Sequence, residues 1–226
     1  VGVVGVISPW NFPMATAVWK IAPALAFGNA VVFKPANLVP GSAWALTEIV
    51  SRQAALPAGS FNLIMGKGST VGDQLVNSDK IDAVTFTGSL PVGRQVASAT
   101  AANLVKCQLE MGSKNALIVA ADADIEVAVN AAFIGAFSGT GQKCTASSRL
   151  IVDASLHDEF VARLKAKLED TVVGPALDAG VEMGPVASEQ QLSENLNWIE
   201  QGVKDGATLA CGGQRLQLSK PGYYMS

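Results

Sequence analysis

The stretch DAVTFTGSLPVG, residues 82–93, decides the fold class. Its first half is apolar and rich in residues that favour strands, which predicts a buried strand over residues 82–86. The small residues Thr87, Gly88 and Ser89 then form a turn, and a helix is predicted over residues 91–102. A buried strand that turns directly into a helix is the building unit of a parallel α/β sheet.

The same order of strand, turn and helix recurs on both sides of this stretch. Its repetition predicts a doubly wound, Rossmann-like parallel sheet with right-handed crossovers, in which ligands bind at the carboxyl ends of the strands. The expected strands are residues 1–8, 30–34, 61–65, 82–86 and 104–110, and the expected helices are residues 14–27, 42–55, 71–77 and 91–102.

A second α/β region is predicted after the last of these strands. We place a domain boundary near residues 112–115, with one domain over 1–112 and another over 113–226. In the second region we expect strands at 116–120, 149–152 and 207–211 and helices at 125–137, 156–171 and 187–205, the first helix capped from Asp122-Ala123-Asp124. Both ends of the chain interrupt strand-like sequence, so the chain is expected to be an internal segment of a longer protein.

Composition excludes several classes of protein. The chain has 226 residues, of which 49% are hydrophobic and 15% charged, and a net charge of −3, as expected for a globular protein with buried sheets. Without a basic run, neither nucleic acid nor an anionic membrane is an expected partner, and no apolar stretch is long enough to span a bilayer. Three widely spaced cysteines favour a reduced, cytoplasmic setting, and the single His157 gives no expected metal site.

Two glycine-rich turns are candidate phosphate-binding loops. Residues 66–72 read G-x-G-x-x-x-G between a predicted strand and helix, and residues 87–89 with Gly93 form a similar junction. Amides at a helix N-terminus bind phosphate well. On spacing alone, a tight structural turn explains the first loop as well as cofactor binding does.

Three polar residues occupy positions where each has both a structural and a functional interpretation. Asn11, in the turn PWNFP at 9–13, either caps the next helix or donates a hydrogen bond to an oxyanion. Lys34 ends a strand and is either a solvated lysine or a ligand for ribose or phosphate. Glu110 is either an exposed strand end or a general base.

Cys144 is the strongest candidate nucleophile. It lies in GTGQKCTASSR, residues 139–149, where small neighbours leave room for a ligand beside the sulfur. No histidine lies nearby in the sequence to act as its base, which argues against a Cys-His enzyme. Cys107 and Cys211 lie in strand-like sequence and are expected to be inert.

Taken together, these stretches resemble the aldehyde dehydrogenase superfamily over essentially the whole chain. The matching motifs, in order, are PWNFP at 9–13, Lys34-Pro35, the glycine loop at 66–72, FTGS at 86–89 with Gly93, LEMGSKN at 109–115, GQKC at 141–144 and Met183-Gly184-Pro185. The GQKC and LEMGSKN stretches look closest to bacterial semialdehyde dehydrogenases such as those that act on 2-oxoglutarate semialdehyde.

The resemblance implies an oxidoreductase that converts a small-molecule aldehyde into a carboxylic acid. Cys144 would attack the aldehyde, Asn11 with the Cys144 amide would form the oxyanion hole, hydride would pass to NAD or NADP, and Glu110 would activate the water that hydrolyses the thioester. It also implies a full-length homo-oligomer, dimer or tetramer. The implied cofactor-binding residues are Ile7, Ser8, Pro9, Trp10, Lys34, Asn37, Gly68, Gly72, Phe86, Thr87, Gly88, Ser89 and Met111.

Two departures from the family pattern affect these expectations. Asn37 stands where NAD-preferring relatives often carry Glu, and a neutral residue does not repel a 2′-phosphate, so NADP is expected to be tolerated. Ser113 replaces a glycine after Glu110.

Two other functions are alternatives to an active aldehyde dehydrogenase. One is a non-catalytic fragment or cofactor-binding module, and the other is a thiol acyltransferase.

Overall fold

The computed structural model describes residues 1–53 and 55–226. The chain divides into two compact units, Val1–Gly112 and Ser113–Ser226, which are described one at a time.

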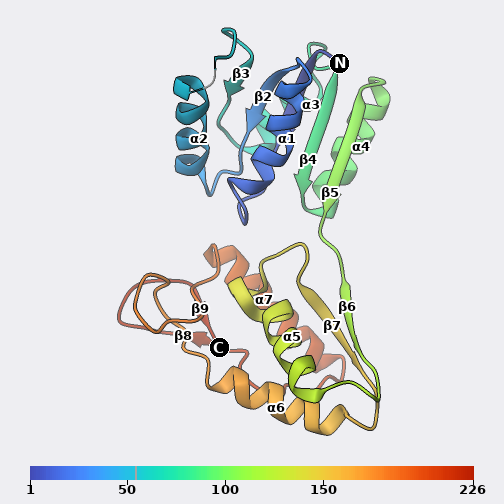
Figure 1. The fold of residues 1–226 in the computed structure, drawn as a ribbon, viewed down its shortest axis with the longest axis vertical. Coiled ribbons are helices and arrows are strands. Elements are labelled where there is room, and N and C mark those ends of the chain that lie inside the picture. The colour runs from blue at the N-terminus through green and yellow to red at the C-terminus, as the bar shows by residue number, and fades with distance from the viewer. Residues whose placement is uncertain (54) are drawn as a thin grey trace. The chain divides into compact units, whose positions relative to one another are not determined.

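The first unit is built on a five-stranded sheet of order β3-β2-β1-β4-β5, with every neighbouring pair parallel (Figure 1). The strands are β1 (Val3–Ile7), β2 (Ala30–Lys34), β3 (Phe61–Leu63), β4 (Ala83–Gly88) and β5 (Lys106–Met111). The sheet has the predicted parallel α/β architecture, and the order reverses at β1, where chain connections leave to either side.

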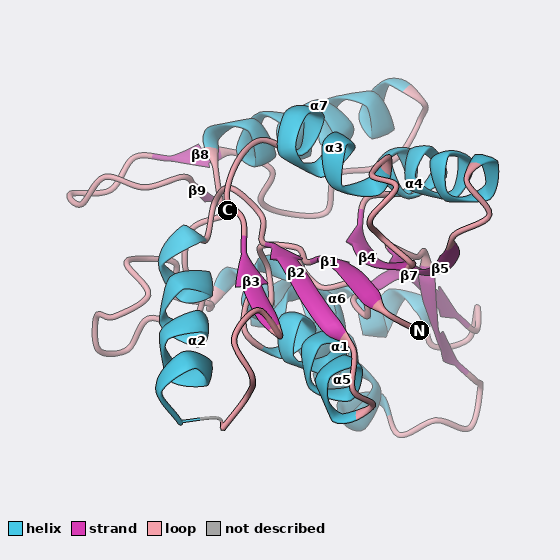
Figure 2. Ribbon diagram, turned by 90° about the horizontal axis from the view of Figure 1, so that it is seen from above, coloured by secondary structure: helices cyan, strands magenta, loops and turns pink. Residues whose placement is uncertain are grey.

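Helices cover both faces of this sheet (Figure 2). They are α1 (Ala15–Ala26), α2 (Pro40–Gln53), the π-helical turn Gly68–Gly72, α3 (Asp73–Val76) and α4 (Leu90–Ala102). Successive strand residues point to opposite faces, so β1 supplies Val4 and Val6 to a core with α1 and α2, and Val3 and Ile7 to a core with α3 and α4. The predicted helix at 42–55 corresponds to α2, and residue 54 of that prediction lies outside the described residues.

Parallel pairing brings the carboxyl ends of the strands to one edge of the sheet. Ile7 pairs with Lys34, and Thr87 pairs with Glu110. The loops that follow the strands therefore open on the same edge, and these loops hold most of the residues expected to bind a cofactor.

The second unit contains a two-stranded parallel sheet, β6 (Asn115–Val119) and β7 (Ser147–Val152). Its other elements are α5 (Ile125–Phe137), the 3₁₀ turn Ser138–Gly141, α6 (His157–Glu169), α7 (Glu189–Lys204), and the antiparallel pair β8 (Arg215–Leu216) and β9 (Tyr224–Met225). Its core joins the sheet to α5 and α6 through Val119, Ala132 and Phe160.

One predicted strand of this unit is wrong. Residues 207–211 form no strand, although their sequence is apolar. The short apolar run has no pairing partner, because the neighbouring β8 pairs instead with β9. Among the described residues, no helix has both the length and the apolar character needed to cross a bilayer.

Candidate active site

The turn after β1 fixes the side chain of Asn11. Its Oδ1 accepts a hydrogen bond from the Phe12 amide at 3.1 Å, and the Phe12 carbonyl accepts one from the Thr16 hydroxyl at 2.7 Å. The N-cap of α1 is Met14, without a side-chain capping bond, so Asn11 does not cap this helix. Because Oδ1 is the acceptor, Nδ2 is the donor end that an oxyanion would need.

Glu110 lies near the carboxyl end of β5, and its side chain is exposed within the chain described. The Gln108 side chain donates a hydrogen bond from Nε2 to Glu110 Oε1 at 2.8 Å. On the other face of β5, Met111 lies against α4, where a Cβ added to Gly93 would come within 2.3 Å of its sulfur. Gly93 therefore lets α4 approach the end of the strand.

Cys144 lies in the second unit, in a turn between the 3₁₀ segment and β7. Its thiol is free and exposed. The chain reaches this turn through Gly139, Thr140 and Gly141, all with positive φ. A Cβ at Gly141 would approach the Ala136 carbonyl to 2.7 Å, so this position needs glycine on both counts.

Three side chains fix the backbone around the thiol. Asn115 donates from Nδ2 to the carbonyls of Cys144 and Ala146, at 2.8 and 3.2 Å. The ammonium of Lys143 binds the Ile134 carbonyl at the end of α5, and Gln142 Oε1 accepts from the Ala187 amide at 3.0 Å. In the second unit as described, no group accepts a hydrogen bond from the Cys144 amide, which is therefore a candidate oxyanion donor.

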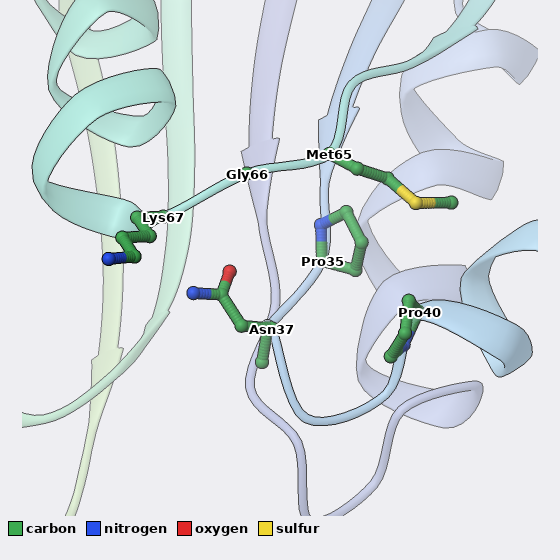
Figure 3. A pocket seen from close by; sticks show the side chains of 7 residues that line it. Pro35, Asn37, Pro40, Met65, Gly66 and Lys67 are labelled. Atoms are coloured by element: carbon green, nitrogen blue, oxygen red, sulfur yellow. The ribbon is translucent and has the colours of Figure 1, made fainter.

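A cavity of about 240 Å³ opens beyond the carboxyl ends of β2 and β3 (Figure 3). Its wall is formed by Pro35, Ala36, Asn37, Pro40, Met65, Gly66 and Lys67. Figure 3 shows the Asn37 amide turned toward the segment that carries Gly66 and Lys67. Asn37 thus lies where the sequence predicts a cofactor contact.

Lys34 is buried beside this cavity, with 4% of its surface exposed. Its Nζ donates to the carbonyl of Pro35, a cavity residue, at 2.7 Å, and burial lowers the pKa of its ammonium. A Cβ on Gly72 would contact the Lys34 stem at 3.4 Å, whereas a Cβ on Gly68 would meet nothing within 4 Å. The Gly72 contact would be an ordinary van der Waals distance, and the space beside Gly68 is open, so neither position requires glycine for lack of room.

The junction between β4 and α4 completes this edge of the sheet. Ser89 is the N-cap of α4, but its side chain makes no capping hydrogen bond, and the first turn of α4 contains no acidic residue. The backbone amides at the start of α4 therefore face neither a capping hydroxyl nor a carboxylate of that turn. The Phe86 ring lies under Gly88, where a Cβ would come within 2.5 Å of it. Just after β1, Ser8 Oγ is buried and has no hydrogen-bond partner among the described residues. A bound ligand could supply the missing hydrogen bond.

The candidate residues divide between the two units. The first unit holds Asn11, Glu110 and all the predicted cofactor residues, and the second holds Cys144. The sequence analysis missed Gln108 and Asn115, which donate hydrogen bonds to Glu110 and Cys144, and Lys20, which donates to Gln108. The one charged residue in the apolar stretch ATAVWKIAPALA was a signal for Lys20. In the part of the chain that the structure describes, no cluster of three or more His, Cys, Asp or Glu residues could hold a metal ion.

The model of the aldehyde dehydrogenase family matches residues 1–226, and the chain belongs to this family. It is 49% identical, over 99% of its length, to an alpha-ketoglutaric semialdehyde dehydrogenase of Bacillus subtilis, and 46% identical, over 94% of its length, to a 2,5-dioxopentanoate dehydrogenase of Saccharolobus solfataricus. These alignments cover 46% and 44% of the two relatives, so the chain spans about half their length.

A solved structure agrees with the fold over the whole chain. The NAD+ complex of an aldehyde dehydrogenase from Bacillus cereus is 39% identical, with a TM-score of 0.95, and the match covers 100% of this chain and 45% of that one.

Proposed function

We propose that the protein is an NAD(P)-dependent aldehyde dehydrogenase that oxidises an aldehyde to a carboxylic acid. Residues 1–112 are part of its cofactor domain, and residues 113–226 are part of its catalytic domain. The observation that carries the proposal is Cys144, a free and exposed thiol in a glycine-shaped turn whose carbonyls are fixed by Asn115, within a chain that matches the family throughout.

The first chemical step forms a bond between Cys144 Sγ and the aldehyde carbon. The thiolate is the attacking species, and the carbonyl oxygen becomes an oxyanion. The Asn11 side-chain amide and the Cys144 backbone amide are the proposed donors to that oxygen. Donors of this kind stabilise the transition state more than the neutral aldehyde, because charge develops only as the bond forms.

NAD(P), when bound, supplies the acceptor for the hydride that leaves the substrate carbon. Cys144 then carries a thioester. Glu110 takes a proton from water as the water oxygen adds to the acyl carbon. Collapse of this adduct breaks the bond to Sγ, releases the carboxylic acid and returns the thiolate.

The residues at the sheet edge suit a dinucleotide. Lys34 and the cavity beside Asn37 would hold the adenosine ribose, and the amide end of α4, with Thr87 to Ser89, would hold the pyrophosphate. The remaining contacts come from the chain that follows β1, Ile7 to Trp10, and from Gly68, Gly72, Phe86 and Met111. The unpartnered Ser8 hydroxyl supports this placement.

The cavity also supports use of NADP. Asn37 carries no charge, and the exposed Lys67 on the same wall is a cation that a 2′-phosphate would favour. We expect comparable kcat/KM values for NAD and NADP, measured with one saturating aldehyde. Discrimination of about 1000-fold against NADP, about 4 kcal/mol, would contradict this part of the proposal.

A semialdehyde with a second, carboxylate end is the proposed substrate class, with 2-oxoglutarate semialdehyde as the leading member. Two relatives are named for this compound, one as alpha-ketoglutaric semialdehyde and the other as 2,5-dioxopentanoate. Other relatives are named for phenylacetaldehyde and betaine aldehyde, so these two compounds are the competing substrates to assay. We further propose that the full-length protein is a homo-oligomer, either a dimer or a tetramer. We also propose that it is cytoplasmic, because three free cysteines suit a reducing compartment.

The test is aldehyde-dependent NAD(P)H formation by the full-length natural chain and its Cys144→Ala variant. Turnover should vanish in the variant, and Cys107→Ala is the matched control because its thiol is also free and exposed. Equal activity in Cys144→Ala and the parent would overturn the assigned nucleophile. Cofactor-independent acyl transfer that requires Cys144 would favour a thiol acyltransferase, and cofactor binding without turnover of any aldehyde would favour a binding module.

A further inference from the structure

Lys20 is a buried cation in the first unit. It lies on α1 with 8% of its surface exposed, and burial lowers the pKa of its ammonium, while the charge of Glu110 acts in the opposite direction. No carboxylate in the described chain forms an ion pair with it. A buried charge without a direct partner needs some other compensation.

Two neutral oxygens receive the ammonium. Lys20 Nζ donates to Thr85 Oγ1 at 2.9 Å and to Gln108 Oε1 at 3.0 Å, and Thr85 also donates to Gln108 Oε1. Thr85 and Gln108 are register partners on β4 and β5, so they lie side by side on the sheet face that α1 covers. An ammonium group can only donate, which forces the oxygen end of the Gln108 amide toward it.

The other end of the same amide meets Glu110. Residues 108 and 110 are two apart on β5 and share one face of the sheet. With Oε1 held by Lys20 and Thr85, the amino group Nε2 faces Glu110 and donates to its Oε1 at 2.8 Å. Each hydrogen bond therefore points the same way: the Lys20 ammonium donates to the Gln108 amide, and that amide donates to the Glu110 carboxylate.

We infer that Gln108 is a positioning residue for Glu110, because its amide links the buried ammonium of Lys20 to one oxygen of that carboxylate and orients the other toward solvent. The inference rests on the proposed role of Glu110 as the base that activates water. The bridge places negative charge within reach of Lys20 without a direct ion pair. It also limits rotation of a side chain that is otherwise exposed at the end of an edge strand.

The bridge has a specific kinetic consequence. Hydride transfer precedes hydrolysis, so a misplaced Glu110 slows release of the acid and leaves the first NADH unaffected. In Gln108→Met, which keeps the side-chain length but removes both ends of the bridge, we expect kcat to fall about 10-fold, as for loss of one hydrogen bond to a charged group. A rapid burst of NADH, close to one per active thiol, should precede the slow steady state.

A double-mutant cycle in the full-length natural chain tests the inference. Glu110→Gln should also give a burst and a slow steady state, and Gln108→Met added to it should change kcat by less than about twofold, because the two residues act as a unit. Gln95→Met, an exposed glutamine on α4, is the control and should keep the parent rate. Gln108→Glu is a second test in case Gln108→Met does not fold. Its carboxylate still accepts a hydrogen bond from Lys20 but repels Glu110, so its kcat should fall further than that of Gln108→Met.

The possible outcomes separate the inference from the function on which it rests. If Glu110→Gln turns over normally, the proposed role of Glu110 fails. If Glu110→Gln is slow but Gln108→Met and Gln108→Glu keep both the parent kcat and a burst-free time course, the positioning role fails alone. Equal, additive losses in both backgrounds would also overturn it, because a purely structural effect does not depend on Glu110.

Discussion

At the scale of single residues, Asn115 at the start of β6 holds the turn that carries Cys144, the proposed nucleophile. Its one amide group donates to carbonyls on either side of Thr145, so the turn that carries Cys144 is tied to the start of β6. A turn held at both ends keeps its amides and its thiol in one arrangement, which a pre-formed oxyanion site needs.

Removing this side chain should loosen the turn. For Asn115→Ala we expect kcat/KM to fall about 10- to 100-fold, as for the loss of two hydrogen bonds that each contribute about 1 kcal/mol or slightly more. The rate of Cys144 alkylation by iodoacetamide, measured without cofactor, should change as well. Asn197→Ala, at an exposed position on α7, is the matched control. Parent kinetics in Asn115→Ala would show that the turn is held by Gln142 and Lys143 without it.

Lys34 should make the stability of the protein depend on pH in a defined direction. Burial lowers its pKa below the ordinary value of 10.5. Between the lowered pKa and 10.5 the unfolded chain binds more protons than the folded chain, so stability rises with pH in that window. Below the window, the cost of burying the charge is constant.

The comparison is between the parent and Lys34→Met, which keeps the length of the side chain. As the pH rises through the window below 10.5, the melting temperature of the parent should rise relative to that of the variant. Lys80→Met serves as the control, because its side chain is 83% exposed, and its difference from the parent should stay flat. A parent that loses ground to Lys34→Met as pH rises would contradict the assigned direction.

The sequence singled out Cys144 as a candidate nucleophile but not the residues that contact its turn. Cys144 stands out because its neighbours are small and polar, and that contrast is local. The hydrogen bonds of Lys20 to Thr85 and Gln108, and of Asn115 to Cys144 and Ala146, join residues that are 29 to 88 positions apart, and no local pattern encodes them. Whether Glu110 is exposed also depended on the edge position of β5.

At the scale of elements, the start of α5 shows how one side chain sets a boundary. The sequence offered Asp122 and Asp124 as caps, and the structure uses Asp124, whose Oδ1 accepts from the amides of Glu126 and Val127 at 2.9 and 3.0 Å. The negative charge also lies at the positive end of the helix dipole.

Asp124→Ala should therefore lower the free energy of unfolding by about 1 kcal/mol, within the range of about 0.5 to 2 for a lost N-cap. The measurement is the free energy of unfolding from urea denaturation, for Asp124→Ala and, as a control, for Asp122→Ala. Asp122→Ala removes an equal charge two residues earlier and should cost only a few tenths of a kcal/mol, about the size of a surface change. Equal losses in both variants would mean that general charge, and not capping, stabilises the start of α5.

Element types followed from hydrophobic periodicity, whereas some ends and pairings did not. The strands β1, β2 and β4 are apolar, bounded by turn residues and covered on both faces, so pattern and tertiary structure agree. The helix predicted at 71–77 is shorter, because a π-helical turn at Gly68–Gly72 occupies its start. The run at 207–211 has strand-like composition but no pairing partner, and β-propensity is decided by such partners.

At the scale of the whole molecule, the proposed site residues are divided between two units that each have their own core. The repeated strand and helix pattern predicted the parallel sheet, because each strand before β5 is followed by a helix that returns the chain to the same end of the sheet. It could not predict the supporting contacts of the site, because those join elements distant in the sequence.

This division predicts that cofactor binding and thiol reactivity can be lost separately in the full-length natural chain. Lys34 and the cavity beside it belong to the first unit, so Lys34→Met should weaken NAD(P) binding about 10-fold, about 1.4 kcal/mol, measured by titration calorimetry. The turn that holds Cys144 is fixed by second-unit contacts, so alkylation of Cys144 without cofactor should stay within about twofold of the parent rate. Cys144→Ala should give the reverse, with cofactor affinity kept and thiol labelling lost, and Cys211→Ala should change neither. If Cys144→Ala lost as much cofactor affinity as Lys34→Met, the prediction of separate losses would be overturned, because cofactor binding would then depend on the thiol as much as on Lys34.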